Sequence, residues 1–208
     1  MGDSAEVMAR LKRKPGVPYQ ALTPNVKGFE AAMVAGTPEV AVFAAATESF
    51  SKRNTNCTIA ESLERFEPLL AMAKQKGVPV RGFVSVVCGC PFEGEVDPNK
   101  VADVTEKLVR MGCYDVGLGD TIGTGTPIKV QRMIDACAAR VGIEKLGVHF
   151  HDTYGQALAN ILAALEMGVD KIDSSVGGLG GCPYAPGATG NVATEDVVYM
   201  LDGMGVKT

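Results

Sequence analysis

Short apolar segments alternate with amphipathic segments along almost the whole chain. Apolar runs such as VAVFAA at 40–45 and GVHF at 147–150 predict β-strands. Strands that are apolar throughout are typical of a parallel sheet covered on both faces. The predicted strands lie at 19–23, 39–45, 79–86, 114–119, 145–151 and 169–175.

The segments between these strands have the spacing of amphipathic helices. Apolar residues recur every three or four positions, as at Val101, Val104, Leu108 and Met111. Glycines follow the last turns of three such segments, where a left-handed residue is favoured, at Gly77, Gly112 and Gly168. The predicted helices lie at 3–13, 27–36, 59–76, 98–111, 127–140, 155–167 and 193–203.

Repetition of a strand and a helix predicts an α/β protein, here as a single domain over residues 1–208. Six such units fit either an open doubly wound sheet or part of a barrel, and the pattern does not choose between them. In both architectures, functional groups gather at the carboxyl ends of the strands. No GxGxxG motif follows the first strand, and GDTIGTG at 119–125 lacks the context of a dinucleotide-binding loop.

The composition of the chain limits the classes of partner that we expect it to bind. The chain is 46% hydrophobic and 21% charged, and its net charge of −4 argues against nucleic acid or an anionic membrane as the main partner. No apolar run reaches 18 residues, and residues 1–16 lack the apolar core of a signal peptide. The six cysteines show no CxxC pair, which fits a reducing compartment, and Cys88 and Cys90 are interpreted as packing residues.

The two histidines of the chain stand two residues apart at the end of a predicted strand. Side chains at this spacing project from the same face of a strand, so His149 and His151 are candidate metal ligands. The alternative is a pair of strand-end histidines held by hydrogen bonds. Their spacing alone does not separate the two interpretations.

A glycine-rich loop at 177–190 follows the last predicted strand and carries Cys182. Its glycines can absorb large changes in φ and ψ, so we expect it to move as a lid. We expect Cys182 to be exposed there, and an exposed cysteine in a lid is a candidate for chemistry. Asn191 ends the loop as either a helix cap or a metal ligand.

Six segments together resemble the family of 3-hydroxy-3-methylglutaryl-CoA lyases, metal-dependent carbon–carbon lyases built on a TIM (β/α)8 barrel. The Cys182 loop distinguishes these lyases from the related Claisen-type synthases. The matching segments are LTPNVKGFEAA (22–32), VRGFVS (80–85), GCPFEGEV (89–96), LGDTIGTGTP (118–127), VHFHDTYGQALAN (148–160) and SSVGGLGGCPYAPGATGNVATED (174–196).

The resemblance implies cleavage of 3-hydroxy-3-methylglutaryl-CoA to acetyl-CoA and acetoacetate, as in leucine degradation. It implies that His149, His151 and Asn191 bind a divalent cation, and mixed nitrogen and oxygen ligands suit Mg2+ or Mn2+. It also implies that Asp120 or His149 accepts the hydroxyl proton and that Cys182 donates a proton to the enolate.

Other matching residues have structural alternatives. Asp120 can also organise a turn, and Glu195, a further catalytic candidate, can also complement the dipole of the last helix. Arg81 and Asn25 are substrate-binding candidates. Arg81 could equally form an ion pair, and Asn25 could approach the CoA arm.

The resemblance further implies that this chain covers strands 3 to 8 of the barrel and is truncated at both ends. The family's Arg-Asp pair at the end of its first strand has no counterpart here. We therefore expect this chain to be poorly active by itself. We expect a homo-oligomer in a bacterial cytoplasm or a mitochondrial matrix, without nucleic acid or membrane. Two alternatives are an isopropylmalate or homocitrate synthase-like acyltransferase, and a catalytically incomplete fragment that binds metal or CoA.

Overall fold

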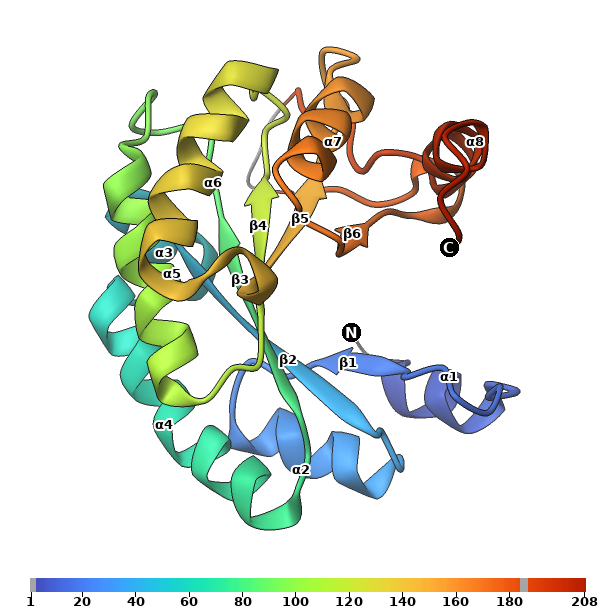
Figure 1. Ribbon diagram of the computed structural model, residues 1–208. Coiled ribbons are helices and arrows are strands. Elements are labelled where there is room, and N and C mark those ends of the chain that lie inside the picture. Colours follow the sequence, from blue (N-terminus) through green and yellow to red (C-terminus); the bar gives the residue numbers. More distant parts are fainter. Residues whose placement is uncertain (1–2, 184–186) are drawn as a thin grey trace.

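The computed structural model describes residues 3–183 and 187–208 and contains one curled parallel sheet (Figure 1). Its six strands are neighbours in the same order in which they occur along the chain. A doubly wound sheet reverses its strand order at a switch point, so this order identifies a barrel-type sheet. The strands are β1 (Gln20–Leu22), β2 (Glu39–Ala45), β3 (Val80–Ser85), β4 (Val116–Asp120), β5 (Leu146–Phe150) and β6 (Ile172–Asp173).

Most of the longer helices cover the outer side of the curl, whereas α1 and α8 lie at its two open ends (Figure 1). The helices are α1 (Ser4–Arg10), α2 (Val26–Val34), α3 (Glu48–Thr55), α4 (Ile59–Lys76), α5 (Pro98–Met111), α6 (Pro127–Val141), α7 (Ala157–Glu166) and α8 (Thr194–Gly203), with 3-10 turns η1 (Ile143–Lys145) and η2 (Val176–Gly178). The predicted α/β class and incomplete barrel are confirmed. Helix α3 was not predicted, and β6 is shorter than expected.

The core lies between the outer face of the sheet and the helices. In β4, Leu118 is fully buried in this layer, whereas Gly117 and Gly119 belong to the concave face. A Cβ atom at Gly117 would lie 2.5 Å from the ring of Phe83. The glycines of β4 therefore leave room on the concave face for larger side chains from neighbouring strands.

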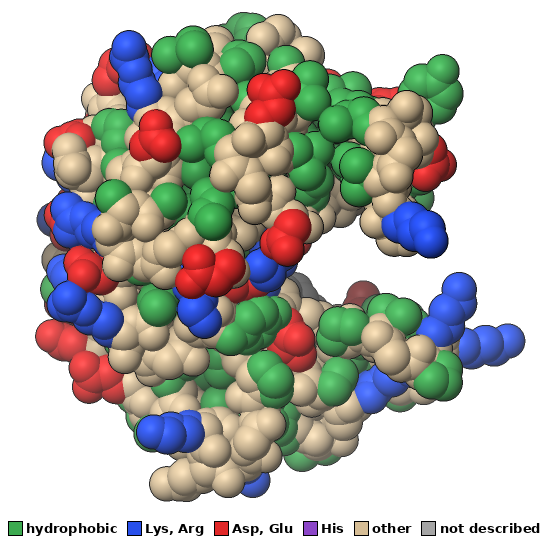
Figure 2. Space-filling view, viewed as in Figure 1, with side chains coloured by type: hydrophobic (Ala, Val, Ile, Leu, Met, Phe, Trp, Pro, Cys, Tyr) green, Lys and Arg blue, Asp and Glu red, His purple; other side chains and the backbone are tan. Residues whose placement is uncertain are grey.

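The curl does not close among the described residues. Strands β1 and β6 are the two edges of the sheet. A deep notch lies between the N-terminal elements and α8 (Figure 2). Within the described part of the chain, no helix is long and apolar enough to cross a membrane.

Candidate active site

A cavity of about 620 Å³ lies on the concave side of the sheet and extends to the carboxyl ends of the central strands. Its walls come from β1 to β5, from α3, and from both sides of the glycine-rich loop. The lining residues are Gln20, Leu22, Ala41, Phe43, Phe50, Asn54, Phe83, Val84, Ser85, Gly119, Thr121, His149, His151, Gly180, Gly181, Cys182, Pro183 and Asn191. The cavity therefore brings both histidines, Cys182 and Asn191 together.

The three predicted metal ligands are placed by β5 and by a short bridge beside it. The rings of His149 and His151 have centroids 5.7 Å apart, and both line the cavity. His151 forms an antiparallel bridge with Asn191. The amide nitrogen of Asn191 donates to the carbonyl of Leu179 at 2.9 Å, which leaves its Oδ1 available as a ligand.

Two atoms of this group are buried without a hydrogen-bond partner, Nδ1 of His151 and Oδ1 of Asn191. A buried acceptor without a partner costs about 1–3 kcal/mol. Burial, followed by the proximity of His149, lowers the pKa of His151 to about 4, so its imidazole is neutral at neutral pH. A neutral imidazole and an amide oxygen are both metal ligands, so this donor set fits a divalent cation.

Asn191 is needed to complete such a set. Among the described residues, no three His, Cys, Asp or Glu side chains converge in a metal-binding arrangement. The cavity-lining residues that the structure describes also include no Lys, Arg, Asp or Glu.

Cys182 is half-buried and packs against the edge of the core while it lines the cavity. The prediction that it is exposed was wrong, because Cys182 packs against the core and residues 180–183 lie along the cavity. Gly190 lies beside this segment, and a Cβ atom there would come within 2.0 Å of the carbonyl oxygen of Gly180. The predicted lid movement includes residues 184–186, which lie outside the described residues, and it stays a prediction.

Asp120 does not reach the cavity. Its carboxylate is completely buried and accepts the backbone N–H of Gly125 at 2.7 Å and that of Thr124 at 3.3 Å. Burial raises the pKa of Asp120, and the bonds from the loop oppose that rise. Asp120 therefore organises the loop after β4, and its catalytic role stays a prediction.

Glu195 also lies away from the cavity. It is exposed in the first turn of α8, where its Oε2 accepts the N–H of Gly177 at 2.8 Å. That bond and one to its own backbone lower the pKa of Glu195. The carboxylate therefore holds the start of the glycine-rich loop at Gly177, and the catalytic role of Glu195 stays a prediction.

The two substrate-binding candidates occupy different places. Asn25 caps α2 by accepting the N–H of Gly28 at 2.9 Å, and it lines a separate cavity of about 250 Å³ with Asn54 and Arg65. Its proposed approach to the CoA arm stays a prediction. Arg81 is buried and forms ion pairs with Asp115 and Asp173, and its substrate contact also stays a prediction.

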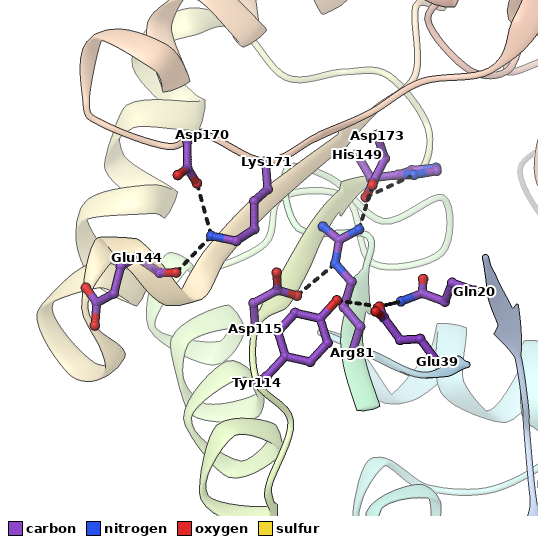
Figure 3. A network of polar contacts seen from close by, with 10 residues as sticks. All are labelled: Gln20, Glu39, Arg81, Tyr114, Asp115, Glu144, His149, Asp170, Lys171 and Asp173. Atoms are coloured by element: carbon purple, nitrogen blue, oxygen red, sulfur yellow. Dashed lines mark hydrogen bonds and ion pairs between the residues drawn. The ribbon is translucent and has the colours of Figure 1, made fainter. Parts of the chain in front are cut away.

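Arg81 is the centre of a polar network inside the curl (Figure 3). Its Nε donates to Asp115 at 2.8 Å, and its Nη1 donates to Asp173 at 2.6 Å. The other carboxylate oxygen of Asp173 lies 3.9 Å from Nδ1 of His149. A buried charge is tolerated only with such partners.

The apolar part of the cavity wall was not predicted from the sequence. Phe43, Phe50 and Phe83 line the cavity together with Asn54 of α3. The strands are apolar on both faces, so hydrophobic alternation could not show which side faces the cavity. Phe50 and Asn54 also belong to the helix that was not predicted.

Comparison with known proteins identifies the family to which this arrangement belongs. The HMGL-like family model matches residues 2–208. The chain is 59% identical over 208 residues to mitochondrial hydroxymethylglutaryl-CoA lyase of Bos taurus, and it spans 64% of that protein. It is 60% identical to the 3-hydroxy-3-isohexenylglutaryl-CoA/hydroxy-methylglutaryl-CoA lyase of Pseudomonas aeruginosa, of which it spans 69%. The crystal structure of hydroxymethylglutaryl-CoA lyase from Pseudomonas aeruginosa superimposes with a TM-score of 0.96, at 60% identity, over 100% of this chain and 69% of that one.

Proposed function

Because the chain belongs to the HMGL-like family, we propose that it carries the metal-binding and proton-donating half of a carbon–carbon lyase site. The proposed substrate is 3-hydroxy-3-methylglutaryl-CoA, and the proposed products are acetyl-CoA and acetoacetate. One observation carries this proposal. One cavity is lined by His149 of β5, by His151 just after it, and by Cys182 and Asn191 of the segment between β6 and α8.

The proposed metal ligands are His149, His151 and Asn191, with Mg2+ or Mn2+ as the cation. When bound, the cation would supply positive charge that acidifies the C3 hydroxyl of the substrate and orients its oxygens. The cavity supports this role because its described lining offers no cationic side chain for the substrate carboxylate. The unpartnered acceptors on His151 and Asn191 support it as well.

The reaction is a retro-Claisen cleavage. The C3 hydroxyl gives its proton to a base, and its oxygen becomes the ketone oxygen of acetoacetate as the C2–C3 bond breaks. The electron pair of that bond forms the enolate of acetyl-CoA. The enolate carbon then takes a proton, and we assign this donation to the thiol of Cys182. The half-buried position of Cys182 supports the assignment, because the thiol can face substrate while being shielded from water.

His149 was a candidate both for binding the metal and for accepting the hydroxyl proton. A ring nitrogen that coordinates a cation cannot accept a proton at the same time. We assign His149 to the metal, because its Nδ1 faces Asp173 and only its Nε2 remains for the cavity. We keep Asp120 as the proposed acceptor of the hydroxyl proton. Because its carboxylate does not line the described cavity, the proton would reach it through an intervening water. Glu195 remains a catalytic candidate outside the described lining.

We further propose an acyl-CoA partner and a reducing compartment, either bacterial cytoplasm or mitochondrial matrix. Five of the six cysteines are buried as free thiols, which suits such a compartment. A homo-oligomer is also proposed.

Acetoacetate release from 3-hydroxy-3-methylglutaryl-CoA with saturating Mg2+ or Mn2+ tests the activity. We expect acetoacetate and acetyl-CoA in equal amounts, at the low rate expected of this chain by itself, and loss of both products with EDTA. Release of free CoA from acetyl-CoA and a 2-oxo acid would instead indicate a Claisen-type synthase. Metal binding without any turnover would indicate a catalytically incomplete domain.

A further inference from the structure

Arg81, Asp115 and Asp173 lie next to the candidate metal site, but none of the three lines its cavity (Figure 3). Arg81 on β3 reaches across the concave face to Asp173 on β6 and also binds Asp115. It therefore ties two strands that are not neighbours in the sheet. The face of Phe83 packs against the guanidinium at 4.8 Å, and the same ring meets His149 edge-on at 6.1 Å.

Two glycines make this crossing possible. A Cβ atom at Gly147 would lie 2.5 Å from Nη2 of Arg81. One at Gly117 would lie 3.4 Å from Oδ2 of Asp173 and 2.5 Å from the ring of Phe83. Neither glycine has a positive φ, so a side chain at either position would act by displacing these groups.

The two carboxylate oxygens of Asp173 have different surroundings. Oδ1 accepts from Arg81, and Oδ2 is buried without a hydrogen-bond partner 3.9 Å from Nδ1 of His149. A small rotation of either side chain would bring Nδ1 and Oδ2 within hydrogen-bond distance. A carboxylate can only accept, so the proton of a neutral His149 would then reside on Nδ1.

We propose that Arg81 and Asp173 are positioning residues that fix the ring and tautomer of His149, so that its unprotonated Nε2 is presented to a cation. A metal-binding histidine commonly donates its other ring nitrogen to a carboxylate in this way. This inference rests on the metal site proposed above. It assigns a function to an ion pair whose two residues do not line the described cavity.

Asp173→Asn is the decisive variant. Arg81 would keep the amide oxygen on its own side, which places the amide NH2 group opposite Nδ1 of His149. That group donates, so the proton of His149 moves to Nε2 and the nitrogen facing the cavity can no longer bind metal. Asp115→Asn is the matched control, because it removes the same charge beside Arg81 without facing His149.

Two measurements report the tautomer of His149 and the affinity for Mn2+. The chain contains two histidines, so the ring 15N NMR spectrum at pH 7.5 is simple, and a His151→Gln variant assigns it. We expect His149 to be protonated on Nδ1 in the natural chain and in Asp115→Asn, and on Nε2 in Asp173→Asn. Electron paramagnetic resonance of free Mn2+ gives the affinity, which should fall about 10- to 100-fold in Asp173→Asn and remain nearly unchanged in Asp115→Asn.

Gly147→Ala provides a second route that leaves all charges in place, should Asp173→Asn fail to fold. It should displace the guanidinium and weaken Mn2+ binding in the same direction. Loss of Mn2+ binding in His149→Ala shows that the natural chain binds Mn2+ through His149. If that holds and the folded Asp173→Asn or Gly147→Ala variant keeps both the tautomer and the Mn2+ affinity, the inference is overturned. Mn2+ binding that is absent, or unaffected by His149→Ala, would overturn the metal site itself and this inference with it.

Discussion

Residues that are neighbours in sequence can lie on opposite faces of the sheet at the candidate site. Gly119 and Thr121 line the cavity, whereas Asp120 between them pairs in register with Phe150, a fully buried core residue. The spacing of His149 and His151 was informative because alternate strand residues share a face. The direction of Asp120 depends on the pairing of β4 with β5, which a uniformly apolar strand does not reveal.

Asp120→Asn tests the structural role of this carboxylate. An amide offers one accepting oxygen, so the N–H groups of Gly125 and Thr124 would lose part of their bonding. We expect the free energy of unfolding to fall by about 1–3 kcal/mol in urea denaturation. Asp135→Asn, on the exposed side of α6, is the control and should change it by less than about 0.5 kcal/mol. Full stability with lost turnover would instead support direct catalysis by Asp120.

Cys182 should be the first cysteine to react with a thiol reagent, because the other five are buried. Burial also raises the pKa of Cys137 to about 11, so little of its thiolate form exists at pH 8. We expect one rapid equivalent in the native protein and six after denaturation. In Cys182→Ser the rapid equivalent should disappear.

The same variant tests proton donation in an active preparation. We expect Cys182→Ser to lower kcat about 10²- to 10⁴-fold with little change in KM, because the thiol acts on an intermediate. Cys137→Ala, inside α6, is the control and should retain kcat. An unchanged kcat in Cys182→Ser would remove the assigned role.

At the level of elements, helix boundaries were predictable where the capping residues are local. Helices α4 and α5 begin and end at the predicted residues. Gly77 and Gly112 close them in the left-handed conformation. Helix α3 was missed because its beginning depends on distant contacts. Thr47 forms no cap bond and instead donates to Cys90 at 3.1 Å, while Phe50 is anchored in the core.

The start of α4 offers a clean comparison of two threonines. Thr58 accepts the N–H of Glu61 at 3.1 Å in a capping box, whereas Thr126 stands at the start of α6 without a side-chain cap bond. Thr58→Ala should lower the free energy of unfolding by about 1 kcal/mol, and Thr126→Ala should have a much smaller effect. Equal losses in chemical denaturation would mean that the cap bond does not contribute.

The same capping box predicts a pH dependence. The backbone N–H and the hydroxyl of Thr58 lower the pKa of Glu61 below its usual value of 4.5. A lowered pKa in the folded state stabilises the protein above the unfolded pKa, and this contribution is lost as pH falls through the folded pKa. Stability should therefore decline less steeply below pH 4.5 in Glu61→Gln than in the natural chain.

At the scale of the whole molecule, the curled sheet has two edges and an open notch (Figure 2). The barrel-type fold was accessible from the sequence only through its resemblance to a family, since six strand–helix units fit two architectures equally well. The order of the strands decides between them, and that order arises from contacts between segments far apart in the chain. The Arg81–Asp173 ion pair also depends on contacts between distant segments, because it joins positions 92 residues apart.

The open edges predict association between copies of this chain. An edge strand presents unpaired backbone groups to other chains. Apolar side chains are exposed on both sides of the notch, with Leu22 44% exposed on β1 and Leu179 71% exposed near the other edge. We expect the sedimentation coefficient to rise with protein concentration, because pairing at these edges buries both backbone and apolar groups.

Leu22→Lys should weaken this association, since a charge on an edge strand opposes pairing. Leu162→Lys is the matched control, because Leu162 is an exposed leucine on α7, on the outer side of the curl. It should associate like the natural chain. Equal sedimentation of both variants would show that association uses another surface. A coefficient independent of concentration in the natural chain would show that the edges do not pair, and the proposed homo-oligomer would then need a different interface.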